Sequence, residues 1–471
     1  MTNQKINGND LLAIGYEGKA IGETLQILQT AYKGKTKAHL LELLQRVLET
    51  PALYKNHAVL APLAEVLLIP KPAEPLPLKE ENPSYSIWGA EGIEAGARNQ
   101  MDIAMRLPVT IAGALMPDAH QGYGLPIGGV LATQNAVIPY GVGVDIGCRM
   151  TMSLYDLPAH FLEKKRDGLK QLLIDNTRFG RATFEKPREH AVIDRPEFKE
   201  IPIMKSLKDR AFQQLGSSGG GNHFVEWGTV ELHDANNEWG LETGTYLALL
   251  SHSGSRGLGA TIAGHYTKLA METCKLPQEA KHLAWLDLDS EAGQEYWQAM
   301  NLAGDYASAC HHQIHERLAE ALAEQPLAII ENHHNFAWKE KDVEGKDIIV
   351  HRKGATPAGR GVLGIIPGSM TAPGFIVRGK GLPASINSAS HGAGRTMSRT
   401  KAKETISPEA VQQQLAQAGV DLIGSGLDEA PGAYKDIRKV MEYQQDLVEV
   451  VGTFSPKIVR MCGDEKFMEV D

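Results

Sequence analysis

A run rich in proline divides the sequence and limits what can be built on either side of it. The segment IPKPAEPLPLKEENP spans residues 69–83. Proline has no amide hydrogen and its ring clashes with the preceding helical turn, so this stretch cannot form a regular helix. We therefore expect an extended linker at 69–84 and a domain boundary there. Between residues 8 and 50, leucine, isoleucine and valine recur at helical spacing, which predicts that 1–68 is a helical region.

The rest of the chain, residues 85–471, is expected to form one domain of mixed α/β (α+β) class. Short apolar runs typical of strands alternate with longer segments of helical periodicity. The strand-like runs are GGVLAT, AVIPYGVGV, KDIIVHR and GFIVRG, and the helix-like segments are 260–275, 290–324 and 408–418. No internal repeat of solenoid length is visible.

Charge and cysteine content bear on the environment and partners of the protein. The formal net charge is −9, whereas nucleic-acid-binding surfaces are generally basic. Any nucleic-acid contact should therefore be confined to a local cleft or be assisted by a metal ion. Four cysteines without a CxxC pair fit a reducing cytoplasm better than a disulfide framework. No signal-peptide pattern or membrane-spanning apolar run is visible, so we expect a cytoplasmic protein with no membrane partner.

Candidate metal ligands follow apolar runs at several places in the sequence. In VGVDIGC, Asp145 and Cys148 are three residues apart, and a carboxylate with a thiolate would suit a transition metal. For this pair alone, a buried cysteine beside a turn-forming aspartate is the favoured interpretation. Histidines next to three further apolar runs favour the metal interpretation instead. They are His223 in GGGNHFVEW, His252 in LLSHSGSRG, and the adjacent His333 and His334 in IIENHHNF. Together these residues predict a metal site.

A second histidine cluster, His311, His312 and His315, lies in the predicted helix 290–324. His311 and His315 are four residues apart on one helical face, a spacing that can bind metal. The surrounding sequence HHQIHERLAEALAEQ is typical of a solvated amphipathic helix and lacks the HExxH pattern. We therefore expect these histidines to lie on a solvent-exposed face and to bind no metal.

Two glycine-rich segments are candidates for contact with a nucleotide. GFIVRGKG nearly matches a phosphate-binding loop, but Gly381 replaces the required hydroxyl residue, so Lys380 is expected to be a turn residue or a phosphate contact. In SASHGAGRTMSR, His391 precedes a glycine turn and is followed by Arg395 and Arg399. A neutral imidazole there could attack phosphorus while the guanidinium groups offset developing negative charge. A loop histidine followed by helix-start arginines explains the same letters, and this segment alone leaves both interpretations open.

Eight motifs resemble those of the RtcB family of RNA ligases and stand in the same order. They are MPDAHQGYGLPIGGV, VGVDIGC, GGGNHFVE, HSGSRGLG, HRKGAT, PGSM, SHGAGRTMSR and DEAPGAYKDI. The resemblance covers roughly residues 85–460. It implies an RtcB-type single catalytic domain with central β-sheets and a cleft for two manganese ions, preceded here by the helical extension. It also implies that the nucleotide is GTP.

The resemblance further implies roles for individual residues. Cys148 would bridge the two manganese ions, and His391 would carry GMP. The other implied metal ligands are Asp145, His223, His252 and His334, the last chosen over His333 because it directly precedes Asn335. The implied nucleotide contacts are Asn222, Phe224, Glu226, Gly368, Ser369, Gly392, Ala393, Gly394 and Tyr434. The implied substrate contacts are Arg256, Arg395 and Arg399.

The reaction implied by the resemblance joins an RNA 3′-phosphate or 2′,3′-cyclic phosphate end to a 5′-hydroxyl end, in RNA repair or tRNA splicing. It proceeds through a histidine–GMP intermediate, and the need for an activating protein partner is left open. Two alternative functions use the same cleft. One is a metal-dependent phosphoesterase or cyclic-phosphate hydrolase acting on RNA ends, and the other is a non-catalytic protein that binds RNA ends.

The sequence departs from the family pattern where the base would be held. Gly374 stands where a serine helps to hold guanine. The last residues, SPKIVRMCGDEKFMEVD, lack the usual terminal lysine, which leaves Lys457 or Arg460 as substitutes. ATP or relaxed nucleotide use is therefore an alternative to GTP. The residues around the cysteine in DIGCRM also differ from the usual ones, which could alter the choice of metal.

Overall fold

The computed structural model describes residues 6–68 and 75–463. The chain divides into two compact units, Met1–Glu74 and Pro75–Asp471. The proline-rich stretch expected to be a linker, 69–84, lies partly outside the described residues, at 69–74. Its described remainder, 75–84, contains neither helix nor strand.

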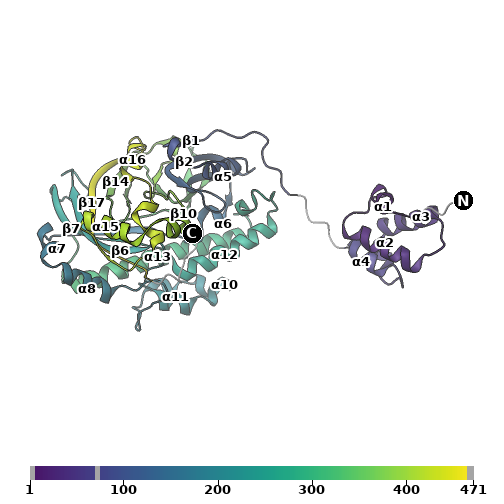
Figure 1. Ribbon diagram of the computed structural model, residues 1–471, viewed down its shortest axis with the longest axis horizontal. Helices are drawn as coiled ribbons and strands as arrows, with labels where there is room; N and C mark the ends of the chain where they lie inside the picture. Colours follow the sequence, from purple (N-terminus) through teal and green to yellow (C-terminus); the bar gives the residue numbers. More distant parts are fainter. Residues whose placement is uncertain (1–5, 69–74, 464–471) are drawn as a thin grey trace. The chain divides into compact units, whose positions relative to one another are not determined.

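The first unit is a set of short helices with a core of its own (Figure 1). Its elements are α1 (Gly8–Ala13), α2 (Lys19–Ala31), α3 (Lys37–Glu49), the 3-10 helix η1 (Pro51–Tyr54) and α4 (Ala61–Leu68). Asn7 and Asp10 cap the start of α1 reciprocally, side chain to backbone. Buried leucines form the core, and the Tyr16 hydroxyl donates a hydrogen bond to the Leu44 carbonyl at 2.8 Å. The predicted N-terminal helices are confirmed.

A five-stranded sheet forms one part of the second unit, in the order β1-β2-β3-β11-β10. The strands are β1 (Ser86–Ile87), β2 (Thr110–His120), β3 (Ile127–Thr133), β11 (Asp347–Lys353) and β10 (Asn335–Lys341). Only the β1–β2 pair is parallel. Helix α5 (Ala95–Met105) packs against β2. A Cβ at Gly113 of β2 would lie 2.4 Å from the Met101 side chain, so the glycine permits this close approach.

An eight-stranded sheet forms the other part and nearly closes on itself. Its order is β13 (Leu363–Ile366), β14 (Gly374–Gly379), β17 (Val448–Met461), β6 (Phe224–Leu232), β7 (Gly244–Ser253), β5 (Arg149–Tyr155) and β9 (Ala328–His333), with β16 (Asp421–Ile423) parallel beside β17. The two edge strands β13 and β9 approach each other through Asn332. The Ile365 amide donates to Asn332 Oδ1 at 2.9 Å, and Asn332 Nδ2 donates to the Ile365 carbonyl at 3.4 Å. The Asn332 side chain of β9 thus hydrogen-bonds to the backbone of β13 where the two edge strands meet.

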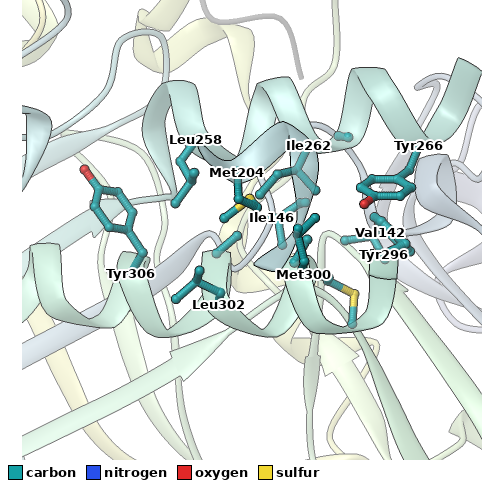
Figure 2. Packing of buried hydrophobic residues seen from close by; sticks show 14 of the residues in the cluster. Val142, Ile146, Met204, Leu258, Ile262, Tyr266, Tyr296, Met300, Leu302 and Tyr306 are labelled. Carbon is teal, nitrogen blue, oxygen red and sulfur yellow. The ribbon is translucent and has the colours of Figure 1, made fainter. Parts of the chain in front are cut away.

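Two long helices, α12 (Arg256–Thr273) and α13 (Glu291–Leu322), pack together, and α13 also contacts β5 and β7 of the eight-stranded sheet. The Ser290 hydroxyl caps α13 by accepting from the Gly293 amide at 3.1 Å. The helix ends where Ala323 turns into the left-handed region with φ 59°. Figure 2 shows the buried side chains between the two helices, with Leu258, Ile262 and Tyr266 of α12 facing Tyr296, Met300, Leu302 and Tyr306 of α13.

The remaining elements are short. The helices are α6 (Pro139–Val142), α7 (Ala159–Lys164), α8 (Arg166–Asn176), α9 (Glu197–Glu200), α10 (Pro202–Lys205), α11 (Lys208–Gln214), α14 (Arg399–Thr405), α15 (Pro408–Ala418) and α16 (Ile437–Glu442). The 3-10 helices are η2 (Ala90–Gly92), η3 (Ala191–Asp194), η4 (Lys281–Leu283), η5 (Pro383–Ser385), η6 (Leu427–Glu429) and η7 (Pro431–Ala433). Two further strand pairs are β4 (Ala136–Val137) with β8 (Leu286–Asp287), and β12 (Ala355–Pro357) with β15 (Ser388–Ser390).

The mixed α/β class is confirmed, with one local correction. AVIPYGVGV, predicted as a strand, is a strand only at Ala136–Val137 and then becomes α6. Pro139 begins that helix because its fixed φ and missing amide hydrogen suit a first helical position. Within the described ranges, no helix combines the length and apolar character needed to cross a bilayer.

Candidate active site

One cavity of the second unit is lined by residues from both large sheets. The five-stranded sheet contributes His120, Ile127, Asn335 and Lys353. The eight-stranded sheet contributes Met150, Phe224, Glu226, His252, Gly374, Phe454, Val459 and Met461. Loops between the strands complete the lining with Asp145, Cys148, His334, His391 and the glycines that follow His391. Nearly all the residues selected from the sequence therefore meet around one space.

Cys148, His223 and His252 form a buried cluster, of which Cys148 and His252 line this cavity and His223 does not. The Cys148 sulfur lies 3.1 Å from His252 Nε2 and 3.5 Å from His223 Nε2. Each residue stands at or near the end of a strand, which fixes its direction. Gly147, with φ 69°, turns the chain into β5, and a Cβ there would lie 2.8 Å from the Gly304 backbone of α13. Only glycine allows Cys148 to be placed so close to that helix.

Asp145 and His334 extend the cluster on either side. Asp145 Oδ2 lies 3.0 Å from His223 Nε2, and its Oδ1 accepts a hydrogen bond from the Ser255 amide at 3.2 Å. His334 Nε2 lies 3.2 Å from His252 Nε2. Two imidazole nitrogens at this distance can share at most one proton, so at least one lone pair points into the cluster. His333, the alternative to His334, instead stacks on Trp338 with ring centroids 5.0 Å apart.

The donor set suits a transition metal. One thiol, one carboxylate and three imidazoles converge, and such mixed sulfur, nitrogen and oxygen ligands select borderline cations. Burial, followed by the charges of the neighbouring histidines, holds the pKa of His334 well below its ordinary value. The ring is therefore neutral, the form that binds metals. His334 Nδ1 is buried and has no hydrogen-bond partner among the described residues, so no protein hydrogen bond decides which of the two ring nitrogens keeps the lone pair for a cation.

His391 lies beside this cluster and is held by a residue that the sequence analysis left without a role, Asp118. The ring centroids of His391 and His334 are 5.0 Å apart. His391 Nδ1 lies 2.7 Å from Asp118 Oδ2, which also accepts from the His391 amide at 3.2 Å. Asp118 is fully buried near the end of β2. Because the carboxylate accepts a hydrogen bond from Nδ1, the ring proton stays on that nitrogen, and the Nε2 lone pair of His391 is left for attack on an electrophile.

Charge keeps Asp118 ionised despite its burial. Burial alone would raise its pKa, but the hydrogen bond from His391 and the charges of His391 and Lys435 hold the pKa below its ordinary value. Lys435 is fixed nearby by donating to the carbonyls of Pro117 and Ala119. A Cβ at Gly394, φ 72°, would lie 2.0 Å from the Asp118 carbonyl oxygen. The glycine turn after His391 thus lets the two segments meet.

Both arginines of the SHGAGRTMSR motif line the cavity and are paired with buried carboxylates. Arg395 Nη1 lies 3.4 Å from Glu429 Oε2, and its guanidinium carbon lies 5.2 Å from the Tyr434 ring centroid. Arg399 pairs with Glu429 and, at 3.3 Å, with Asp428. The Tyr434 hydroxyl donates to Glu429. Glu429 was not singled out in the sequence, although it lies in the DEAPGAYKDI motif.

The predicted nucleotide contacts all line the same cavity, namely Asn222, Phe224, Glu226, Gly368, Ser369, Gly392, Ala393, Gly394 and Tyr434. Burial raises the pKa of Glu226 well above its ordinary value. Gly374 also lines the cavity, whereas Lys457 and Arg460 do not. Arg460 turns away from it, donating to the Leu173 carbonyl, with its guanidinium carbon 5.6 Å from the Phe179 ring centroid. The residues beyond 463 lie outside the described part.

Two predicted contacts lie elsewhere. Arg256 is buried at the start of α12 and does not line the cavity. It donates to the Gly180 carbonyl at 2.5 Å and lies 3.4 Å from the Ser217 hydroxyl, so its substrate role stays a prediction. Lys380 donates to the Gln445 carbonyl at 2.6 Å, which fits the turn interpretation rather than a phosphate contact.

The expectation that His311 and His315 face solvent was wrong. Both side chains are buried between α13 and the eight-stranded sheet. The Ser251 hydroxyl lies 2.6 Å from His311 Nδ1 and 2.8 Å from His315 Nε2, and His311 Nε2 lies 3.0 Å from the Ser253 carbonyl. These contacts satisfy the imidazoles, which is why the two polar rings can be buried. They fall on either side of His252 in β7 and brace that strand.

Comparison with known proteins identifies relatives over the second unit. The family model described as tRNA-splicing ligase RtcB matches residues 100–201 and 197–461. The RNA-splicing ligase RtcB of Escherichia coli K12 is 35% identical over 408 residues, covering 80% of this chain and 97% of that protein. The RNA-splicing ligase RtcB of Mycobacterium tuberculosis is 32% identical over 425 residues, covering 76% and 98%. The tRNA-splicing ligase RtcB of Thermococcus kodakarensis is 28% identical over 427 residues, covering 75% and 88%.

Proposed function

The chain belongs to the RtcB family of RNA-splicing ligases, and from this premise we propose that it seals RNA ends through a nucleotide carried on His391. The ends joined are an RNA 3′-phosphate, or a 2′,3′-cyclic phosphate opened to it, and a 5′-hydroxyl. The observation that carries the proposal is the Asp118–His391 pair, with its nitrogen and oxygen 2.7 Å apart, lying next to the cysteine–histidine cluster in one cavity. A nucleophile, its orienting carboxylate and a site for a cation are what phosphoryl transfer requires.

We assign two manganese ions to the cluster as cofactors. Cys148, Asp145, His223, His252 and His334 would hold them. When bound, the ions supply Lewis acidity and positive charge at the reacting phosphates. This also explains how an acidic chain, with net charge −9, can act on a polyanion.

Asp118 and His391 would perform the first chemical step. Asp118 holds the proton on His391 Nδ1, so Nε2 attacks the α-phosphorus of GTP. The nitrogen–phosphorus bond forms as the bond from that phosphorus to the pyrophosphate oxygen breaks. The ring becomes positively charged in the adduct, and the buried carboxylate of Asp118 stabilises that charge.

Two further transfers complete the reaction. An oxygen of the RNA 3′-phosphate attacks the guanylate phosphorus, and the bond to His391 breaks. The 5′-hydroxyl oxygen of the second strand then attacks the activated 3′-phosphate, loses its proton, and displaces GMP. Arg395 and Arg399, which line the cavity, would neutralise phosphate charge once released from Glu429.

Glu226 supports guanine as the base. An ionised carboxylate accepts hydrogen bonds from the two adjacent donors on the guanine edge, whereas adenine presents an acceptor there. Because burial raises the pKa of Glu226, base binding has to stabilise the ionised form of a buried carboxyl group. Gly374 offers no side chain to help, so ATP remains the alternative nucleotide.

The test is transfer of label from nucleotide to protein. Purified protein is incubated with manganese and α-labelled GTP or ATP and analysed on a denaturing gel. We expect an acid-labile label from GTP that is absent in His391→Ala. Label from ATP alone would mean that ATP, and not GTP, is the nucleotide used. Absence of label from both, in protein that contains metal, would favour a phosphoesterase or cyclic-phosphate hydrolase, and a metal-free protein that still binds RNA ends would favour a non-catalytic role.

A further inference from the structure

Three rings gather beside the catalytic cavity on the side of the five-stranded sheet. They are Tyr123, in the loop between β2 and β3, Tyr140 of α6, and His282 of η4. The ring centroids of Tyr140 and His282 are 5.4 Å apart, and that of Tyr123 lies 6.4 Å from each. We call these three rings the aromatic platform. Tyr123 is 54% exposed, and the other two rings are half-buried.

Lys353 joins the platform to the cavity. This residue lines the cavity, and its amino group lies 5.8 Å from the Tyr140 ring centroid. The same amino group donates to the Tyr123 carbonyl at 2.6 Å. His120, which also lines the cavity, lies three residues before Tyr123. The platform therefore adjoins the wall of the cavity at Lys353.

Local backbone geometry fixes the rings in place. Gly124 has φ 69°, and a Cβ there would lie 3.0 Å from the His282 carbonyl oxygen and 3.3 Å from Tyr140 Cβ. Glycine thus lets the Tyr123 loop close onto the other two rings. None of the three rings belongs to the apolar core clusters found among the described residues. The three rings contact one another but are not part of the apolar core.

Two positively charged lysines lie near the three rings. Burial lowers the pKa of His282, and the charges of Lys281 and Lys353 lower it further, so both lysines act on the platform. Aromatic faces flanked by lysines bind single-stranded nucleic acid, since bases stack on the rings and phosphates approach the amines. Because the chain has a net charge of −9, three aromatic rings with two lysines beside the cavity are a distinctive local feature. They indicate which kind of ligand binds there.

We propose that the aromatic platform stacks the terminal base of the RNA strand that carries the 5′-hydroxyl. This inference rests on the proposed function and adds a substrate subsite to it. In the sealing step, the 5′-oxygen must enter opposite the departing GMP, because the displacement at phosphorus is in line. The base pocket around Glu226 belongs to the eight-stranded sheet, so the incoming strand approaches along the five-stranded sheet, where Lys353 and Tyr123 lie.

The experiment separates the subsite from the chemistry by comparing Tyr123→Ala with Tyr123→Phe, which keeps the ring. In the manganese-loaded full chain, we expect Tyr123→Ala to raise the KM for the 5′-hydroxyl strand about 5- to 150-fold, the range typical of one lost stacking contact. Formation of the His391 adduct from GTP should be unchanged, and Tyr123→Phe should behave as the wild type. Equal KM values in all three proteins would overturn the proposal.

A fluorescence titration tests the same subsite without turnover. A 5′-hydroxyl RNA with 2-aminopurine as its first base should be quenched on binding to the wild type and Tyr123→Phe, and much less on binding to Tyr123→Ala. Quenching confined to a probe at the end of the 3′-phosphate strand would refute the assignment of the strand. Failure of the wild type to form any His391 adduct would instead refute the proposed function, while the titration would still decide whether RNA stacks here.

Discussion

Replacing Asp118 by asparagine should slow nucleotide transfer to His391 while leaving the fold intact. Asparagine has the same shape, and the site is fully buried, so packing around β2 is preserved. The variant loses the negative charge 2.7 Å from His391 Nδ1. It can also turn its amide group toward Nδ1, which would move the ring proton to Nε2 and block attack by that nitrogen.

The size of the effect follows from the charge that His391 gains. A hydrogen bond to a charged group contributes about 1.5–3 kcal/mol. A unit charge pair about 4 Å apart interacts by about 4 kcal/mol at the effective dielectric constant of partly buried sites. Both figures describe the single contact between Asp118 and His391, so they are not added. We take about 3–4 kcal/mol as the stabilisation of the adduct-forming transition state that the variant loses. At 1.36 kcal/mol per factor of ten, the rate should fall roughly 10²- to 10³-fold.

The assay is single-turnover formation of the labelled His391 adduct from α-labelled GTP with saturating manganese. Metal content and the melting temperature of Asp118→Asn are measured alongside, so that loss of metal or of fold is not mistaken for loss of orientation. A rate within about threefold of the wild type, with normal metal content, would refute the role given to Asp118.

Four further predictions concern other parts of the molecule. Cys148→Ser should lose bound manganese, measured by elemental analysis, and with it adduct formation, because the thiolate is one of the proposed metal ligands; full occupancy would contradict this. Folding raises the pKa of Glu226, so its protonated carboxyl group favours the folded state. This contribution to the free energy of unfolding is complete below the ordinary carboxyl pKa and is lost as pH rises through the raised pKa of the folded state. Glu226→Gln should therefore melt above the wild type at pH 8 but not at pH 4, and an equal difference at both would contradict the reasoning. His311→Phe should lower the free energy of unfolding by about 1–3 kcal/mol, since the Ser251 hydroxyl and Ser253 carbonyl lose a buried partner, and denaturant titration measures this. A chain that begins at residue 75 should still form the His391 adduct, because the first unit has its own core; loss of labelling in a folded truncation would show that the unit serves the active site.

The positions of the site residues could be predicted because they follow a local rule. Cys148, His223, His252 and His334 each stand where an apolar run meets a polar or glycine-rich loop, and in the structure each lies at or near the end of a strand. The helices 408–418 and 290–324 could also be predicted, because the helical spacing of their apolar residues is visible within each segment.

What could not be predicted depends on partners far away in the sequence. Nothing near Asp118 indicates that its carboxylate meets His391, 273 residues later. His311 and His315 count as polar in a helical pattern, and only the serines of β5 and β7 reveal that they can be buried. The approach of β9 to β13 likewise rests on the Asn332 side chain. The hydrogen bond from Arg256 to the Gly180 carbonyl also joins residues far apart in the sequence.

The place of β17 has a consequence for how the protein matures. This strand, the last in the described part of the chain, lies between β14 and β6 in the interior of the eight-stranded sheet and supplies Phe454, Val459 and Met461 to the cavity wall. During synthesis the residues of the cysteine–histidine cluster and His391 leave the ribosome first, yet the part of the cavity wall that β17 supplies is absent until residue 461 has followed. Contacts of such long sequence separation form late in folding. A nascent or prematurely terminated chain would therefore have an incomplete cavity, so the order of synthesis would delay the proposed nucleotide binding until the sheet is complete.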